Sequence, residues 1–136
     1  MPWVAWMPRE ELIRKYGDFD LFVFPSLHDS GGMAVLEALS FGLPVVCLDL
    51  GGPGIAVNNE CGRVISTAGV TERQVVDRIA QFLTQVLDYR TMLHGMSEAA
   101  GKRAAMLSWQ SNVNSVYGEP LVPRQSQLEG VSSVHP

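Results

Sequence analysis

Two kinds of hydrophobic pattern alternate along the first half of the chain. Residues 20–24 (DLFVF) and 44–50 (PVVCLDL) form near-continuous apolar runs. Runs that are apolar on both faces are typical of strands in a parallel sheet that helices cover. Shorter runs at 3–7 (WVAWM) and 61–66 (CGRVIS) predict two more strands.

The segments between these runs have helical spacing. Residues 8–17 (PREELIRKYG) have acids near the start and a glycine at the end, which predicts a helix. Residues 31–42 (GGMAVLEALSFG) place apolar side chains at helical intervals and stop at Gly42, so a buried helix is expected there. Strand and helix therefore alternate, which predicts right-handed crossovers and a parallel α/β sheet.

The second half of the chain is predicted to be helical. Thr71 and Gln74 form a capping box that opens a helix over 71–87, and two more helices are expected at 90–107 and 108–118. Residues 119–136 are rich in Pro, Ser, Gly and Gln and have no apolar period, so we expect a disordered tail. The predicted domain therefore covers residues 1–118.

Composition narrows the class of protein. A chain of 136 residues with 46% apolar content can bury one core. Its net charge of −4, without a basic run, argues against nucleic acid as a partner. No apolar run reaches the roughly 18–20 residues of a membrane span, and the start of the chain lacks an export signal. Cys47 and Cys61 match neither a disulfide framework nor a metal site, so a cytoplasmic chain with reduced thiols is expected.

The residues that could form a binding site are concentrated in residues 24–37 (FPSLHDSGGMAVLE), where a predicted strand is followed by a loop and a helix. Open parallel sheets bind ligands at this position. The backbone amides of Gly31, Gly32, Met33 and Ala34 lie at the predicted helix start, where they favour an anion such as a diphosphate. Glycine there lets phosphate oxygens approach the backbone closely.

Two acids flank this helix start. Glu37 lies about two turns into the helix, ~9 Å along its axis, where its carboxylate could accept both hydroxyls of a ribose. Asp29 would then face a sugar on the other side of the phosphates. Alternatively, Asp29 or Ser30 could cap the helix, and Glu37 could form a salt bridge to a neighbouring helix. Gly51-Gly52 after the next strand indicates either a tight turn or close approach to a ligand.

The order of these residues resembles a known family. The shared positions are Asp20, Pro25-Ser26, Asp29, Gly31-Gly32, Glu37-Ala38, Gly42-Leu43-Pro44-Val45, Gly51-Gly52 and Gly62. In this order they resemble the donor-binding half of the group 1, glycogen-synthase-like retaining glycosyltransferases, which have two facing Rossmann-like domains in the GT-B arrangement. The resemblance runs from Trp3 to Tyr117.

The resemblance implies a role for each residue of the segment. Asp29 would contact the transferred sugar and Glu37 the ribose, as the two acids of the catalytic site. Ser30, Gly31, Gly32, Met33 and Ala34 would hold the diphosphate of a nucleotide sugar, without a metal ion. The first acid is Asp where the family has Glu, and the turn reads Ser-Gly-Gly where the family has Gly-aromatic-Gly.

The resemblance also implies what this chain lacks. In the family, an Arg and a Lys from earlier strands clamp the diphosphate, and an acceptor-binding domain lies further upstream. We therefore expect a fragment, or a chain completed by a partner, that is inactive alone and self-associates through an exposed sheet edge. The alternative functions are an inactive nucleotide- or phosphate-binding module and, fitting the motif less well, a nucleotide-sugar epimerase.

Overall fold

The computed structural model describes residues 3–108. Nine elements follow in order: α1 (Arg9–Lys15), the 3-10 helix η1 (Tyr16–Asp18), β1 (Phe22–Phe24), α2 (Met33–Ser40), β2 (Val45–Leu48), α3 (Gly51–Ala56), β3 (Gly62–Ile65), α4 (Glu72–Asp88) and α5 (Arg90–Met106). The helix expected at 108–118 falls almost wholly outside the described residues, and the tail expected at 119–136 lies outside them entirely.

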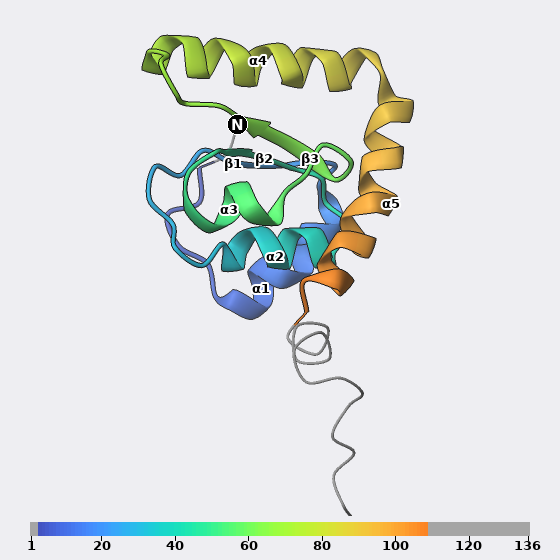
Figure 1. Ribbon diagram of the computed structural model, residues 1–136. Coiled ribbons are helices and arrows are strands. Elements are labelled where there is room, and N and C mark those ends of the chain that lie inside the picture. Colours follow the sequence, from blue (N-terminus) through green and yellow to red (C-terminus); the bar gives the residue numbers. More distant parts are fainter. Residues whose placement is uncertain (1–2, 109–136) are drawn as a thin grey trace, which may run out of the picture.

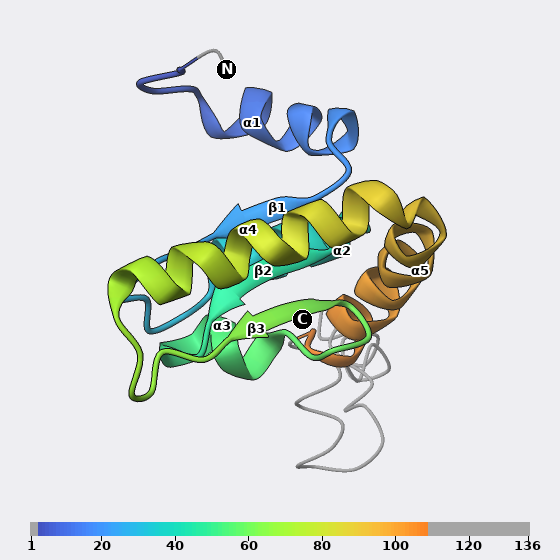
Figure 2. The same cartoon turned by 90° about the horizontal axis from the view of Figure 1, so that it is seen from above.

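The three strands form one parallel sheet in the order β1-β2-β3. Val45 at the start of β2 lies opposite Phe22 of β1 and Gly62 of β3, so the strands start level with one another. Their carboxyl ends therefore lie along one edge of the sheet, where the loop from β1 to α2 begins (Figure 2). This arrangement confirms the predicted parallel α/β fold.

Helices cover both faces of the sheet. In Figure 1, α2 and α3 lie below the strands, α4 lies above them, and α5 runs down the side of the body. β2 contributes side chains to an apolar cluster on each face of the sheet. Val45 and Cys47 belong to one cluster, and Val46 and Leu48 belong to the other. All four of these side chains are buried, as expected for a central parallel strand.

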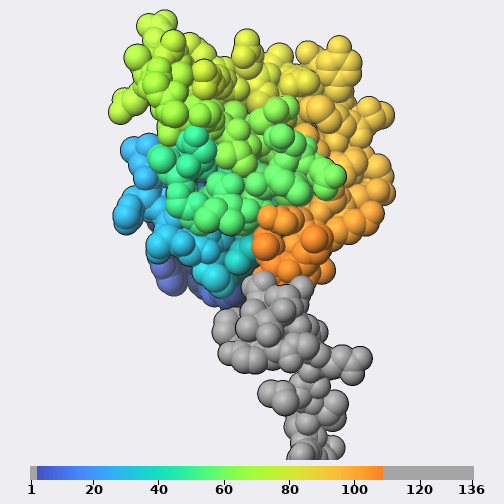
Figure 3. Space-filling model, in the orientation of Figure 1, coloured from blue at the N-terminus to red at the C-terminus, as the bar shows by residue number. Residues whose placement is uncertain are grey.

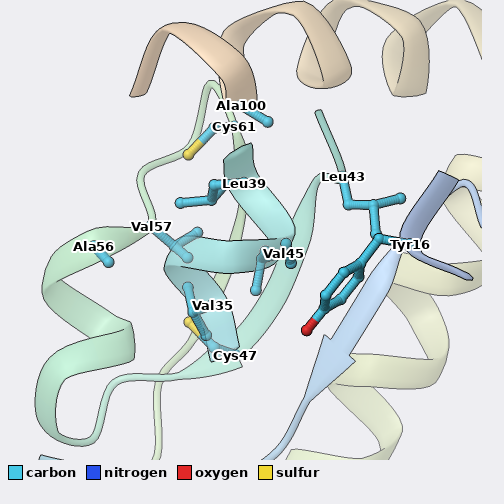
Figure 4. Close-up of a cluster of buried hydrophobic side chains, with 11 residues drawn as sticks. Tyr16, Val35, Leu39, Leu43, Val45, Cys47, Ala56, Val57, Cys61 and Ala100 are labelled. Atoms are coloured by element: carbon cyan, nitrogen blue, oxygen red, sulfur yellow. The ribbon is translucent and has the colours of Figure 1, made fainter. Parts of the chain in front are cut away.

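The apolar cluster that contains Val45 and Cys47 joins β2 to α2. Val35 and Leu39 of α2 are fully buried against Val45 and Cys47, and Ala100 of α5 closes the cluster from the side (Figure 4). On the opposite face, α4 and α5 contribute Phe82, Val86 and Met96 to the second cluster. The two clusters therefore fix α2 and α4 on opposite faces of β2.

Local signals in the sequence explain how these helices are held. The predicted capping box is present, since the Gln74 amide donates to Thr71 Oγ1 at 3.3 Å and the Thr71 amide donates to Gln74 Oε1 at 2.8 Å. Ser97 Oγ of α5 donates to the carbonyl of Gly42 at 2.6 Å, directly after α2. In the space-filling view, α4 and α5 form a continuous outer rim (Figure 3).

The strand predicted at 3–7 is wrong. The segment has no strand partner among the described residues, and Trp3 and Trp6 are 90% and 80% exposed. An apolar run becomes a strand only where a neighbouring strand takes up its backbone hydrogen bonds. In the part of the chain that the structure describes, β1 pairs with β2 alone, so its other edge is open.

Helix α3 is an element that the sequence pattern did not predict. Its sequence, GGPGIA, has the composition of a turn. Pro53 is tolerated because it occupies the third position of the helix, where the amide has no acceptor within the helix. Pro53 is also buried, so packing favours a helix that propensity does not.

Among the described residues, no helix has the length and apolar character needed to cross a membrane.

Candidate functional site

The predicted site residues lie on the β1–α2 loop and the first two turns of α2. This loop leaves the carboxyl end of β1 and passes beside the start of α3. The structure therefore places the segment at the edge of the sheet where open α/β folds bind ligands.

The Asp29 carboxylate is bonded to backbone amides of its own loop. Its Oδ1 accepts hydrogen bonds from Gly31 N at 3.0 Å and from Gly32 N at 2.6 Å. Gly32 has a φ of +59°, a left-handed conformation that glycine adopts without strain. Two of the four amides expected to face phosphate are thus held by Asp29. Both precede the first turn of α2, and among the described residues no side chain caps this helix, so the capping role weighed for Asp29 or Ser30 is absent.

The amides of the first turn of α2 are differently placed. Gly32 is the N-cap, so the amides of Met33, Ala34 and Val35 have no acceptor within the helix. No hydrogen bond from these amides occurs among the described residues, and none is formed by the Ser30 hydroxyl. The positive end of the helix is therefore available to an anion at Met33 and Ala34, two of the predicted residues.

Glu37 forms an ion pair with α1. Arg9 Nη2 donates to Glu37 Oε1 at 2.5 Å, and the side chains are 71% and 24% exposed respectively. This contact is the salt bridge to a neighbouring helix that was the alternative role predicted for Glu37. The carboxylate is partly exposed, so a ribose could still reach it. Burial, followed by the charge of Glu37, raises the pKa of Tyr16, while Arg9 lowers it.

Gly51 and Gly52 lie against the Asp29 loop. Gly52 N donates to the Asp29 carbonyl at 3.1 Å. A Cβ on Gly51, whose φ is +64°, would lie 2.1 Å from that carbonyl oxygen, and a Cβ on Gly52 would lie 2.8 Å from the Ser30 oxygen. The two glycines therefore allow the two backbone segments to pack directly against each other, which fixes the loop. Neither role predicted from the sequence, a tight turn or close approach to a ligand, included this packing.

Asp49 organises the same edge of the sheet at the end of β2. Its carboxylate accepts from Thr67 Oγ1 at 2.7 Å, Ser66 Oγ at 2.8 Å and Thr67 N at 2.9 Å. These bonds, those from Thr67 and Ser66 foremost, hold the pKa of Asp49 below its ordinary value. Asp49 was not predicted from the sequence, although an acid that directly follows an apolar strand is a usable signal.

Arg9 was also missed, and here the sequence offers no comparable signal. Arg9 and Glu37 are 28 positions apart and belong to different helices. Their contact depends on how α1 docks beside α2, which hydrophobic periodicity does not specify.

An apolar hollow of about 410 Å³ opens at the carboxyl edge on the α4 side of the sheet. Its lining includes Leu27, Leu48, Leu50, Val75 and Val76, but neither Asp29 nor Glu37. Separately, the described part of the chain contains no group of three or more His, Cys, Asp or Glu side chains placed to hold a metal ion.

The parallel sheet, its covering helices and the loop-to-helix site define a Rossmann-like half domain of the kind found in two-domain glycosyltransferases. Residues 2–103 match the family model described as "Glycosyl transferases group 1". The chain belongs to this family.

Curated relatives agree with the family match. The chain is 32% identical over 108 residues to "D-inositol 3-phosphate glycosyltransferase" of Mycolicibacterium smegmatis, covering 79% of this chain and 23% of that protein. It is 34% identical over 118 residues to the protein of the same name in Corynebacterium diphtheriae, covering 82% and 26%. It is 27% identical over 110 residues to "O-antigen chain mannosyltransferase B" of Escherichia coli, covering 80% and 27%. The chain thus spans about a quarter of the length of these relatives.

Proposed function

We propose that this chain is the donor-binding part of a retaining glycosyltransferase that uses a nucleotide-diphosphate sugar. Its family supports sugar transfer in general. The observation that carries the proposal is the position of Glu37 one turn beyond the free first-turn amides of α2, at the carboxyl edge of the sheet. A phosphate on those amides and a ribose on Glu37 fit one nucleotide lying along the start of the helix.

Binding of such a donor exchanges internal partners for ligand groups. The diphosphate takes the amides of Met33 and Ala34 and competes with Asp29 for those of Gly31 and Gly32. The released Asp29 carboxylate then faces hydroxyls of the sugar. Catalysis follows from positioning and from stabilisation of the departing diphosphate by backbone amides, without a metal ion.

A second candidate is a module that binds a nucleotide without transferring sugar. Two observations favour it for this chain on its own. Both acids are already engaged by internal donors, and the chain covers only about a quarter of its relatives. We propose that an acceptor-binding domain, in the same protein or in a partner chain, completes the transferase. The chain alone is then expected to bind a donor and to transfer nothing.

The names of the relatives point to no shared acceptor. The relatives have two different names, one for D-inositol 3-phosphate and one for an O-antigen chain. We further propose a cytoplasmic location, which the free thiols of Cys47 and Cys61 support.

We also propose that the chain associates with a second copy through β1. This strand pairs on one side only within the described residues, and Val23 at its centre is 39% exposed. The nearby apolar side chains of Phe19 and Leu87 are 59% and 66% exposed. An open edge beside exposed apolar surface is a common route to association.

Calorimetric titration with nucleoside diphosphates tests the proposed donor site. We expect UDP, GDP or ADP to bind the 136-residue chain, and we expect no sugar transfer or hydrolysis when the corresponding nucleotide sugars are supplied. Turnover by the chain alone would instead favour a self-sufficient enzyme.

A further inference from the structure

Positive charge is scarce around the segment from Asp29 to Glu37. The segment itself has no Lys or Arg. Of the basic residues that the structure describes, Arg9 is the one with a hydrogen bond or ion pair to this segment. Other arginines are engaged elsewhere: Arg63 lies over the Phe82 ring, and Arg78 and Arg103 donate to backbone carbonyls at Ser66 and Ala56.

The Arg9 guanidinium is held at Glu37, in the second turn of α2. Side chains on a helix lean toward its N-terminus, so the carboxylate of Glu37 lies over the preceding turn. Glu37 follows Met33 by four positions, which is about 6 Å along the helix axis. Arg9 Nη2 is 2.5 Å from that carboxylate, so its positive charge lies within one side-chain movement of the first turn of α2.

The Arg9 side chain is not enclosed by the fold. It is 71% exposed, and α1 contributes no buried residue to either cluster. Exposed ion pairs of this kind are weak, because water screens them and two long side chains lose rotational freedom. Displacing the guanidinium from Glu37 therefore costs a ligand little free energy.

We infer that Arg9 is a cationic ligand of the donor diphosphate at this site. The inference rests on the proposed function and adds a phosphate-binding residue to it. When ribose hydroxyls occupy Glu37, the guanidinium turns from the carboxylate to the phosphate oxygens, which it can bind through two N–H groups at once. Arg9 thereby supplies, from α1, the charge that the segment from Asp29 to Glu37 lacks.

Matched variants of α1 test this assignment. UDP, GDP and ADP, together with the nucleosides uridine, guanosine and adenosine, are titrated into the wild-type chain and into Arg9→Ala, Arg9→Lys and Arg14→Ala. Arg14 is an exposed arginine of the same helix and serves as the control. We expect Arg9→Ala to weaken diphosphate binding about tenfold, the loss typical of one charged hydrogen bond, and not to weaken nucleoside binding, because the ion pair that ribose displaces at Glu37 is then gone.

Further results separate this assignment from its alternatives. Arg9→Lys should retain part of the affinity, and Arg14→Ala all of it. Unchanged or tighter diphosphate binding by Arg9→Ala would overturn the inference, because Arg9 would then only compete for Glu37. An equal loss for nucleosides and diphosphates would also overturn it. If the wild-type chain bound none of the six probes, the proposed function would fail and the assignment of Arg9 with it. Circular dichroism confirms that the variants are folded.

Discussion

At the scale of single residues, the site is organised by contacts between groups far apart in the sequence. Asp29 bonds two amides of its own loop, but Gly52 holds that loop in place from the start of α3. Glu37 is paired with Arg9 of α1. The sequence could predict Asp29 and Glu37 because they fall in a short, recognisable order. It could not predict Arg9 or the role of the glycines, because both depend on how separate elements pack.

Gly51 provides a test of the loop contact. Alanine at this position would have to adopt a φ of +64° and would bring its Cβ to 2.1 Å from the Asp29 carbonyl oxygen. We expect Gly51→Ala to lower the free energy of unfolding by about 2–4 kcal/mol, the sum of backbone strain and overpacking. Urea denaturation measures the change.

Gly95 is the matched control for this substitution. It lies inside α5, and nothing comes within 4 Å of a Cβ built on it. Gly95→Ala should stabilise the chain by about 0.5–1 kcal/mol, because alanine is the better helix former. If Gly51→Ala were as stable as the wild type, the close approach of the two loops would be wrong.

At the scale of elements, periodic patterns predicted what packing reinforces. The strands β1, β2 and β3 and the helices α2, α4 and α5 all lie where apolar spacing and end signals placed them. The two failures have opposite causes. Residues 3–7 have an apolar pattern but no strand to pair with, whereas α3 has turn composition but buries Pro53 against the rest of the fold. Tertiary contacts decide both cases, and local sequence does not record them.

Asp49 links two elements, the end of β2 and the loop after β3, in a pH-dependent way. Hydrogen bonds from Thr67 and Ser66 lower its pKa in the folded chain relative to the unfolded one. The stabilisation is therefore present above about pH 4, the ordinary range of an aspartate, and is lost as the pH falls through the lowered value. We expect Asp49→Asn to be less stable than the wild type at pH 6, with a smaller further loss on going to pH 3.

Urea midpoints measured from pH 6 to pH 3 check this prediction. Asp77, an exposed carboxylate of α4 without a hydrogen bond or ion pair among the described residues, supplies the control Asp77→Asn. This variant should keep the wild-type difference between the two pH values. Parallel pH profiles for the wild type and Asp49→Asn would contradict a structural role for the Asp49 carboxylate.

At the scale of the whole molecule, the sheet has an open edge at β1 within the described residues. If a second copy covers this edge, sedimentation velocity should show a dimer that dissociates on dilution. Val23→Lys places a charge at the centre of the edge strand and should shift the chain to monomer. Ile55→Lys, at a 77% exposed position on α3, should leave the association unchanged. A wild-type chain that remained monomeric at high concentration would refute the proposed association.

The family of the chain is established by its match over residues 2–103, and the donor site is the central claim that follows from it. Glu37 tests this claim most directly, because its carboxylate should accept hydrogen bonds from the ribose hydroxyls. Its ion pair with Arg9 is exposed and is worth only about 0–1 kcal/mol, so Glu37→Ala should remain folded.

The decisive measurement is the affinity of the wild type and Glu37→Ala for a nucleoside diphosphate and for its 2′-deoxy form. We predict that Glu37→Ala weakens binding of the ribonucleotide about tenfold or more, the loss of hydrogen bonds to a charged group. The wild type should prefer the ribonucleotide, and the variant should lose that preference. Unchanged affinity in Glu37→Ala, with the preference for ribose intact, would contradict the account.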